Sequence, residues 1–211
     1  MIAGAIIAGG LSSRMKEGGV AGDKFLQPLD GTSSVIAHVI ARLRPQVETL
    51  IINANTEDTR LSDLGFPVIR DMPSKHGGPL VGILTALTYA HEASLLLTAA
   101  ADTPFVPHDL ADRLLARRNQ TGARIVLATS LEQIHPIFGL WETGLAKELS
   151  AWLAGTNKAS VLSFAKHIGF ETDDFPLAFA GDSPETYYDP FFNINRPDDL
   201  VAARKLAGSM K

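Results

Sequence analysis

Cysteine is absent from this chain. Without it the protein has no disulfides, no thiolate nucleophile and no Cys-ligated metal, and this fits a reducing compartment, so we expect a cytoplasmic protein. An excess of basic residues is missing too, because 19 Lys and Arg stand against 23 Asp and Glu. We expect no nucleic-acid partner, since no basic face would release phosphate counterions.

Long apolar runs are also missing. The first run, Ile2–Ile7, is far too short to span a bilayer and follows no basic residue, so we interpret it as a strand and expect no membrane partner. Internal repeats, low-complexity tracts and linkers are absent as well. The 211 residues, 45% of them hydrophobic, are therefore predicted to form a single domain over residues 1–211 that buries a full core.

Short apolar runs alternate with segments of helical spacing. The runs, which are predicted to be buried strands, are Ile2–Ile7, Thr49–Ile52, Pro67–Ile69, Leu95–Ala100, Ile125–Ala128 and Ile137–Trp141. Apolar residues recur at helical spacing at Val35, Ile36, Val39, Ile40 and Leu43, at Leu110, Leu114 and Leu115, and at Leu145, Leu149 and Leu153. This alternation predicts βαβ units in a Rossmann-like three-layer α/β/α sandwich with a mostly parallel sheet.

A glycine-rich segment with two cations follows the first predicted strand. Paired Gly9 and Gly10 let backbone N–H groups approach an anion, and Arg14 and Lys24 supply the positive charge that a triphosphate requires. The spacing matches neither the Walker A loop nor the G-x-G-x-x-G dinucleotide motif. The alternative is an ordinary glycine turn, but the two cations favour a phosphate-binding loop.

Polar residues follow three more of the predicted strands. They are Asn53-Ala54-Asn55, Asp71 and Asp102-Thr103-Pro104. Each alone is compatible with a turn or a helix cap. Ligands of open α/β sheets lie beyond the carboxyl ends of the strands, so together these residues predict a site.

Asp102 is the predicted Mg²⁺ ligand. Mg²⁺ prefers hard oxygen ligands and keeps several waters, so one carboxylate with substrate phosphates suffices. The alternative is that Asp102 caps a helix that begins near Pro107. A phosphate acceptor is already largely ionised near neutral pH, so the reaction requires no strong general base.

Five segments in the same order resemble the molybdenum cofactor guanylyltransferase family, a group of nucleotidyltransferases. They are Ala8 to Lys24 (A-G-G-x-S-x-R-M…D-K), Asn53, Asp71 with Gly78-Pro79-Leu80-Val81-Gly82, Asp102-Thr103-Pro104, and Asn193 to Leu200. His135-Pro136, at the start of another strand, completes the set. The resemblance implies a nucleotidyltransferase fold and the transfer of GMP from GTP to molybdopterin cofactor, with release of pyrophosphate.

The resemblance also implies roles for single residues. Ile7, Ala8 and Gly9 would line the base side of the nucleotide pocket, Lys24 would contact phosphate, and Asn53 and Asp71 would hold guanosine. Asp102 would carry Mg²⁺, while Gly10 and Arg14 would complete the phosphate loop. The expected partners are GTP, the molybdopterin cofactor, and proteins that deliver the cofactor or receive it.

Three segments depart from the family pattern. The stretch from Met15 to Lys24 is longer than usual, Gly31-Thr32-Ser33-Ser34 lacks a lysine but offers Ser34 as a helix cap, and Asn157 to Ser160 with Lys166 makes a thin positive surface for the acceptor. A cytidylyltransferase of the same cofactor or another small nucleotidyltransferase is an alternative, although Ala8-Gly9-Gly10 and Asp102-Thr103-Pro104 resemble the guanylyl group more. A non-catalytic nucleotide-binding accessory protein is a further alternative.

For some side chains the sequence is compatible with two roles. Asn195 caps the helix that begins at Pro197 or binds the metal, with capping favoured, and His135 contacts the acceptor or holds the start of a strand. His76 lacks the partners of a zinc site, and Trp141 and Trp152 are expected in the core or an interface. Residues 14–22 and 180–189 are the predicted mobile loops.

Overall fold

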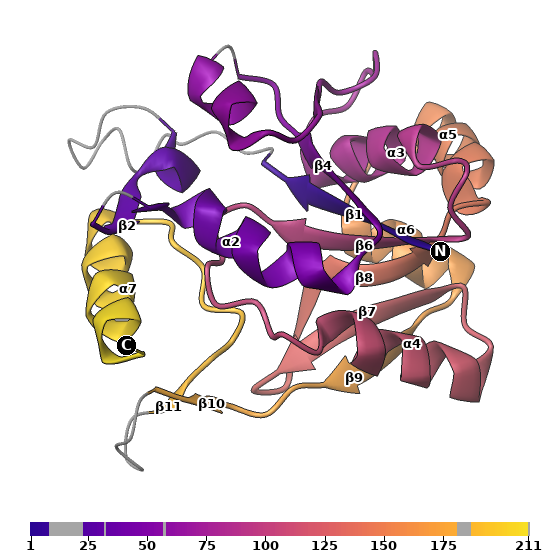
Figure 1. Ribbon diagram of the computed structural model, residues 1–211. Helices are drawn as coiled ribbons and strands as arrows, with labels where there is room; N and C mark the ends of the chain where they lie inside the picture. Colours follow the sequence, from indigo (N-terminus) through magenta and orange to yellow (C-terminus); the bar gives the residue numbers. More distant parts are fainter. Residues whose placement is uncertain (9–22, 32, 57, 181–186, 211) are drawn as a thin grey trace.

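The computed structural model describes residues 1–8, 23–31, 33–56, 58–180 and 187–210. Its centre is a seven-stranded sheet with the order β5-β4-β1-β6-β8-β7-β9 (Figure 1). The strands are β1 (Ile2–Ile7), β4 (Thr49–Asn53), β5 (Val68–Ile69), β6 (Leu95–Ala100), β7 (Ile125–Ser130), β8 (Gln133–Glu142) and β9 (Glu171–Asp174). Neighbours are parallel except where β8 pairs with β6 and β7, so the predicted mostly parallel sheet is confirmed.

Helices cover both faces of the sheet (Figure 1). The α-helices are α2 (Val35–Leu43), α3 (Pro79–Tyr89), α4 (Leu110–Thr121), α5 (Leu145–Gly155), α6 (Val161–Ile168) and α7 (Pro197–Ser209). Short 3-10 helices are η1 (Lys24–Leu26), η2 (Arg44–Gln46) and η3 (Thr59–Leu64), and two small sheets pair β2 (Pro28–Asp30) with β3 (Ser33–Ser34) and β10 (Ala178–Phe179) with β11 (Tyr187–Tyr188). The three-layer architecture is as predicted.

Alternate residues of each central strand enter different cores. On β1, Ala5 and Ile7 pack with α3, α5 and α6, whereas Ile6 packs with α2 and α4. Successive side chains of a strand point to opposite faces, so a strand covered on both sides is apolar throughout. This is why the continuous apolar runs of the sequence are strands, and why Trp141 lies fully buried in the core.

The strand β8 begins four residues earlier than predicted. The apolar run suggested a start at Ile137, but the strand begins at Gln133, because the ladder with β7 shifts register between Leu127 and Ala128 and so accommodates Pro136. Proline cannot donate to a ladder and is tolerated at such a bulge. The bulge leaves the first residues of β8, including His135, paired with β7.

The starts of α4 and α2 test two more predictions, of which the first is corrected and the second is confirmed. The helix expected near Pro107 begins at Leu110, after a turn, and Asp109 precedes it. Asp102 therefore lies too far upstream to cap it. Ser34 does cap α2, as predicted, since its Oγ accepts from the Ala37 N–H at 3.4 Å.

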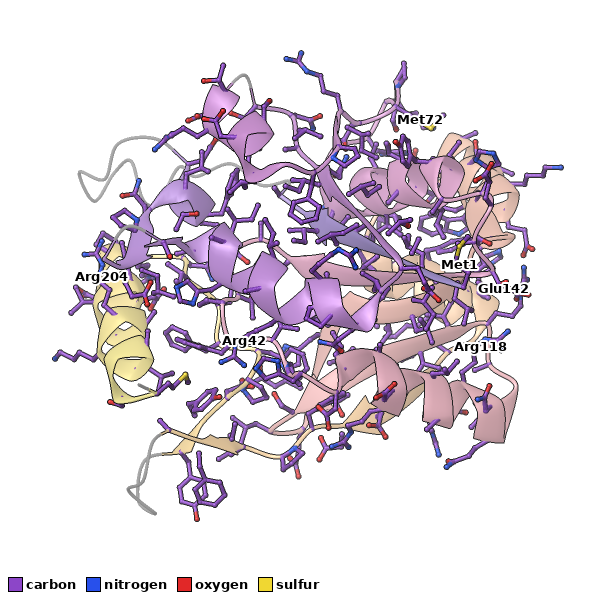
Figure 2. All side chains as sticks on the ribbon, viewed as in Figure 1. Met1, Arg42, Met72, Arg118, Glu142 and Arg204 are labelled. Atoms are coloured by element: carbon purple, nitrogen blue, oxygen red, sulfur yellow. The ribbon has the colours of Figure 1, made fainter. Side chains whose placement is uncertain are left out.

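A third apolar cluster fixes the C-terminal helix α7. Leu200 and Ala203 of α7 pack with Leu29 and Phe105, and the Arg204 guanidinium donates from Nε and Nη2 to the Pro28 carbonyl at 3.0 and 2.9 Å. Figure 2 shows Arg204 on the side of α7 that faces β2. Among the helices of the described segments, none has the length and apolarity needed to cross a membrane.

We predict that Gly139→Ala destabilises the protein. A Cβ at residue 139 would lie 2.7 Å from Leu127 Cδ2 and 2.9 Å from Trp141 Nε1, and both side chains belong to the packed core. Overpacking of this kind costs about 1–3 kcal/mol. Urea unfolding measures the loss. Gly144→Ala is the control, because a Cβ there meets open space, and equal stability of the two variants would contradict the prediction.

Candidate functional site

The ends of the parallel strands bring the predicted residues to one edge of the sheet. The Ala8 N–H donates to the Asn53 carbonyl at 2.8 Å, and the Ala101 N–H donates to the Ile7 carbonyl at 3.1 Å. Ile7 is buried and Ala8 is half-buried. Gly9, Gly10 and Arg14, which were predicted to bind phosphate, lie outside the described residues, so their roles stay predictions.

The first polar cluster surrounds the Asp71 carboxylate after β5. Asn53 Nδ2 donates to Asp71 Oδ1 at 2.9 Å, and Asn55 Nδ2 donates to Asp71 Oδ2 at 2.7 Å. The Asp71 N–H donates in turn to Asn55 Oδ1 at 2.9 Å. Both carboxylate oxygens are held, so the plane of this acceptor group is fixed.

Asn53 reaches Asp71 from a buried position. Its side chain is 1% exposed, and its Nδ2 also donates to the Ile69 carbonyl at 3.3 Å. The other end of the amide lies over α3, where a Cβ at Gly82 would be 2.2 Å from Asn53 Oδ1. Gly82 is thus needed for the close approach of Asn53, and Asn53 acts as a support for Asp71.

The second polar cluster lies beyond β6 and is centred on the Lys24 ammonium. Lys24 Nζ lies 2.5 Å from Asp102 Oδ2 and donates to Asn195 Oδ1 at 2.8 Å. The Lys24 and Asp102 side chains are 16% and 14% exposed, so the pair is largely sheltered from water. Interactions between charges are stronger in such a site than at an open surface.

Asn195 does not cap the last helix, contrary to the favoured interpretation. Asp199 Oδ2 accepts from the N–H groups of Asn195 and Arg196 at 2.9 and 2.8 Å and so holds the start of α7. The Ile194 N–H donates to the Asp102 carbonyl at 3.0 Å, which places this segment beside the end of β6. The Asn195 side chain is thereby free to turn toward Lys24.

His135 lies in a third polar cluster at the start of β8. His135 Nε2 is 2.7 Å from Ser130 Oγ, which donates to Asp189 Oδ1 at 2.8 Å. Burial lowers the pKa of His135, although the nearby Asp189 carboxylate opposes this shift. Contact with Ser130 of the neighbouring strand agrees with a role in holding the strand start.

Other predicted polar residues have structural partners. His76 Nε2 is 3.0 Å from the Leu153 carbonyl in the last turn of α5, and Ser160 Oγ caps α6 by accepting from the Ser163 N–H at 3.1 Å. Within the described ranges, histidine and acidic side chains form no group of three that could hold a metal. Any metal near Asp102 would therefore draw on amide and substrate oxygens as well.

Two contributors to these clusters, Ser130 and Asp189, were missed in the sequence. Asn55 was among the polar residues predicted to follow a strand, and it contacts Asp71. Ser130 and Asp189 are 59 residues apart, and no local pattern joins them.

Solved structures with this fold define the class of protein. Molybdopterin-guanine dinucleotide biosynthesis protein A from Archaeoglobus fulgidus matches with a TM-score of 0.71 and 20% identity over 100% of both chains. The 4-diphosphocytidyl-2C-methyl-D-erythritol synthase from Anaerococcus prevotii gives 0.70 and 10% identity over 99% of this chain and 98% of that one. The fold is that of the nucleotidyltransferases, as the resemblance implied.

Sequence comparison narrows this class to one family. Residues 4–169 match the MobA-like NTP transferase domain. Proteins named molybdenum cofactor guanylyltransferase from Brucella ovis and Brucella melitensis are each 58% identical over 205 residues, which are 97% of this chain and 92% of each relative. The chain therefore belongs to the MobA-like NTP transferase family and is a nucleotidyltransferase.

We predict that Gly82→Ala weakens nucleotide binding by about tenfold or more, since displacing a side chain that supports a buried polar network costs on the order of 1–3 kcal/mol. The new Cβ would displace Asn53 Oδ1 and release Asp71. Calorimetric titration with GTP measures the loss. Gly208→Ala on α7 is the control, because its Cβ meets nothing within 4 Å, and unchanged affinity of Gly82→Ala would contradict the role of Asn53.

Proposed function

We propose that the chain transfers GMP from GTP to the terminal phosphate of the molybdenum–molybdopterin cofactor and forms the guanine dinucleotide cofactor and pyrophosphate. The observation that carries this proposal is the Lys24 ammonium held between Asp102 and Asn195 at the carboxyl edge of the sheet. The names of the Brucella relatives support the choice of nucleotide and acceptor. The whole chain, residues 1–211, acts as one nucleotidyltransferase domain in this proposal.

The nucleotide lies over β1, β4 and β5. Ile7 and Ala8 line its base side, and the Asp71 carboxylate, fixed by Asn53 and Asn55, accepts from guanine N–H groups or ribose hydroxyls. The phosphates extend toward Lys24, with Gly9, Gly10 and Arg14 completing the contacts. Positioning and charge neutralisation supply most of the catalysis in this kind of transfer.

The residues around Lys24 fit a divalent cation. Asp102 Oδ2 and Asn195 Oδ1 are hard oxygens that already converge on one positive charge, and Mg²⁺ prefers such oxygens. Asp102 and Asn195 would hold Mg²⁺ together with the phosphates, and the ion would neutralise charge on the triphosphate. Lys24 contacts phosphate oxygens and stabilises the negative charge that develops on pyrophosphate.

The reaction exchanges one phosphoanhydride bond for another. An oxygen of the acceptor phosphate forms a bond to the α-phosphorus of GTP, and the bond from that phosphorus to the pyrophosphate oxygen breaks. Asp71 and Lys24 hold the two ends of the nucleotide while this happens. The proteins expected to deliver or receive the cofactor belong to the same proposal.

The direct test is a panel of nucleoside triphosphates. With Mg²⁺ and molybdopterin cofactor, we expect GTP to give pyrophosphate and the dinucleotide product and CTP to give far less of both. The names of the Brucella relatives support GTP, and an Asp71 carboxylate that accepts from guanine N–H donors would produce this preference. Chromatography of the product identifies the nucleotide. Preferential use of CTP would overturn the guanylyl assignment, and GTP binding without product would indicate a protein without catalysis.

We predict that Asp102→Asn keeps its fold but loses about 100-fold or more of kcat, because a neutral amide cannot replace a charge in a sheltered phosphate site. Thermal unfolding and initial rates across a Mg²⁺ titration measure the two effects. Asp109→Asn is the control, since Asp109 is exposed at the start of α4. Wild-type turnover of Asp102→Asn at ordinary Mg²⁺ would exclude the metal role.

A further inference from the structure

The cluster of Ser130, His135 and Asp189 fixes the position of a proton. Asp189 Oδ1 accepts from the Ser130 hydroxyl at 2.8 Å and from the Phe191 N–H at 2.9 Å. A serine hydroxyl has one hydrogen, and here that hydrogen is donated in the hydrogen bond to Asp189. Ser130 Oγ can therefore only accept at its 2.7 Å contact with His135, so His135 Nε2 carries a hydrogen.

The other ring nitrogen is then an acceptor. A neutral imidazole has one N–H and one lone pair, so a hydrogen on Nε2 leaves the lone pair on Nδ1. Burial favours the neutral ring by lowering the pKa of His135. The residues that the structure describes provide no hydrogen-bond partner for His135 Nδ1. The hydrogen on Nε2 and the free lone pair on Nδ1 therefore both follow from the hydrogen bond that Ser130 donates to Asp189.

Aromatic rings hold the imidazole in this orientation. Phe191 stacks on His135 with ring centres 4.6 Å apart and planes inclined by 26°, and Phe138 meets it edge-on at 6.4 Å. Ser130, Phe138 and Phe191 are buried, whereas His135 is half-buried. The ring is thus held by Ser130 at Nε2 and by Phe191 on one face.

The strand order places His135 relative to Asp102. Phe191 lies three residues before Ile194, whose N–H binds the Asp102 carbonyl. Strands β6 and β8 are antiparallel, and Thr98 pairs with Gly139. Beyond this pair, the chain after β6 continues toward Asp102, and β8 extends in the same direction back to His135. His135 therefore lies on the β8–β7 side of Asp102, opposite to the β4–β5 side where Asp71 lies.

We infer that His135 Nδ1 binds the terminal phosphate of the acceptor and takes its proton, with Ser130 and Asp189 as positioning residues that set the tautomer. This inference rests on the proposed function. The second pKa of a phosphate monoester is about 6, so about a tenth of its molecules keep this proton at pH 7 and about half keep it at pH 6. The protonated form is the one from which Nδ1 accepts, and the ionised form needs no base. The proton moves from the P–OH group to Nδ1, the resulting dianion attacks the α-phosphorus, and the imidazolium returns the proton to solvent.

Two variants of His135 separate contact with the acceptor from support of the strand. A glutamine places its amide near the Nε2 position and keeps a contact with Ser130, but it has no acceptor at the Nδ1 position. An asparagine keeps an oxygen near the Nδ1 position and loses Ser130. At pH 6, where about half of the acceptor phosphate carries a proton, we expect His135→Gln to raise the KM for molybdopterin about tenfold with the KM for GTP unchanged, since a lost charge-assisted hydrogen bond is worth about that factor.

The asparagine variant gives the complementary result. We expect His135→Asn to keep a KM for molybdopterin near that of the wild type and to lower kcat, because its oxygen accepts a hydrogen bond but takes up no proton. A purely structural His135 would give the opposite pattern, in which Gln behaves as the wild type and Asn does not. That pattern would overturn the inference. Thermal unfolding of each variant confirms that it is folded.

Nitrogen NMR of labelled histidine tests the tautomer without turnover. The wild type should show His135 with a hydrogen on Nε2, and molybdopterin should shift the Nδ1 signal. Ser130→Ala should give a mixture of tautomers, while Ser163→Ala, at a half-buried position in the first turn of α6, should not. A hydrogen on Nδ1 in the wild type, or an Nδ1 signal that does not respond to molybdopterin, would overturn the inference.

The outcomes distinguish this inference from the proposed function. If the wild-type protein forms no dinucleotide product, the proposed function is wrong, whatever the role of His135. If the wild-type protein forms the product and His135→Gln has an unchanged KM for molybdopterin, only the inference about His135 is wrong.

Discussion

The contact between the Lys24 ammonium and the oxygens of Asp102 and Asn195 joins three distant segments of the chain. Lys24 belongs to η1, Asp102 follows β6, and Asn195 precedes α7. Placing a lysine in a sheltered position is unfavourable unless opposite charge and hydrogen bonds compensate it. The same contact therefore requires the segment before α7 to pack against the end of β6, and the third apolar cluster and the bond from Ile194 to Asp102 make that packing possible.

The sheet separates two chemical environments on either side of Asp102. Toward β4 and β5, a carboxylate is held by two amides over a glycine of α3, which produces a rigid set of acceptors suited to recognition of N–H and O–H groups. Toward β8 and β7, an imidazole is held between a buried serine and an aromatic ring. Preorganised groups of this kind need little rearrangement when a ligand binds. Each side thus gains its precision from residues that do not themselves face the ligand.

The sequence predicted the central sheet and part of the site for one physical reason. Strands covered on both faces are apolar throughout and stand out, and residues that follow them reach a common edge, as Asp71 and Asp102 do. The edge strand β9, Glu171–Asp174, was missed because it is polar, and the start of β8 was misplaced because a bulge absorbs Pro136. The partners of Lys24 and Ser130 depend on contacts across 171 and 59 residues, which no local pattern records.

The antiparallel direction of β8 has a consequence for how such proteins diversify. A parallel strand brings its last residues to the ligand edge, but β8 brings its first ones, and these are followed by a bulge rather than by a helix (Figure 1). Replacements around residues 130–135 and 187–191 would leave β1 and β4 untouched, because these strands lie on the other side of β6. With the acceptor and the nucleotide placed as proposed, a change of acceptor would need changes on one side of β6 alone.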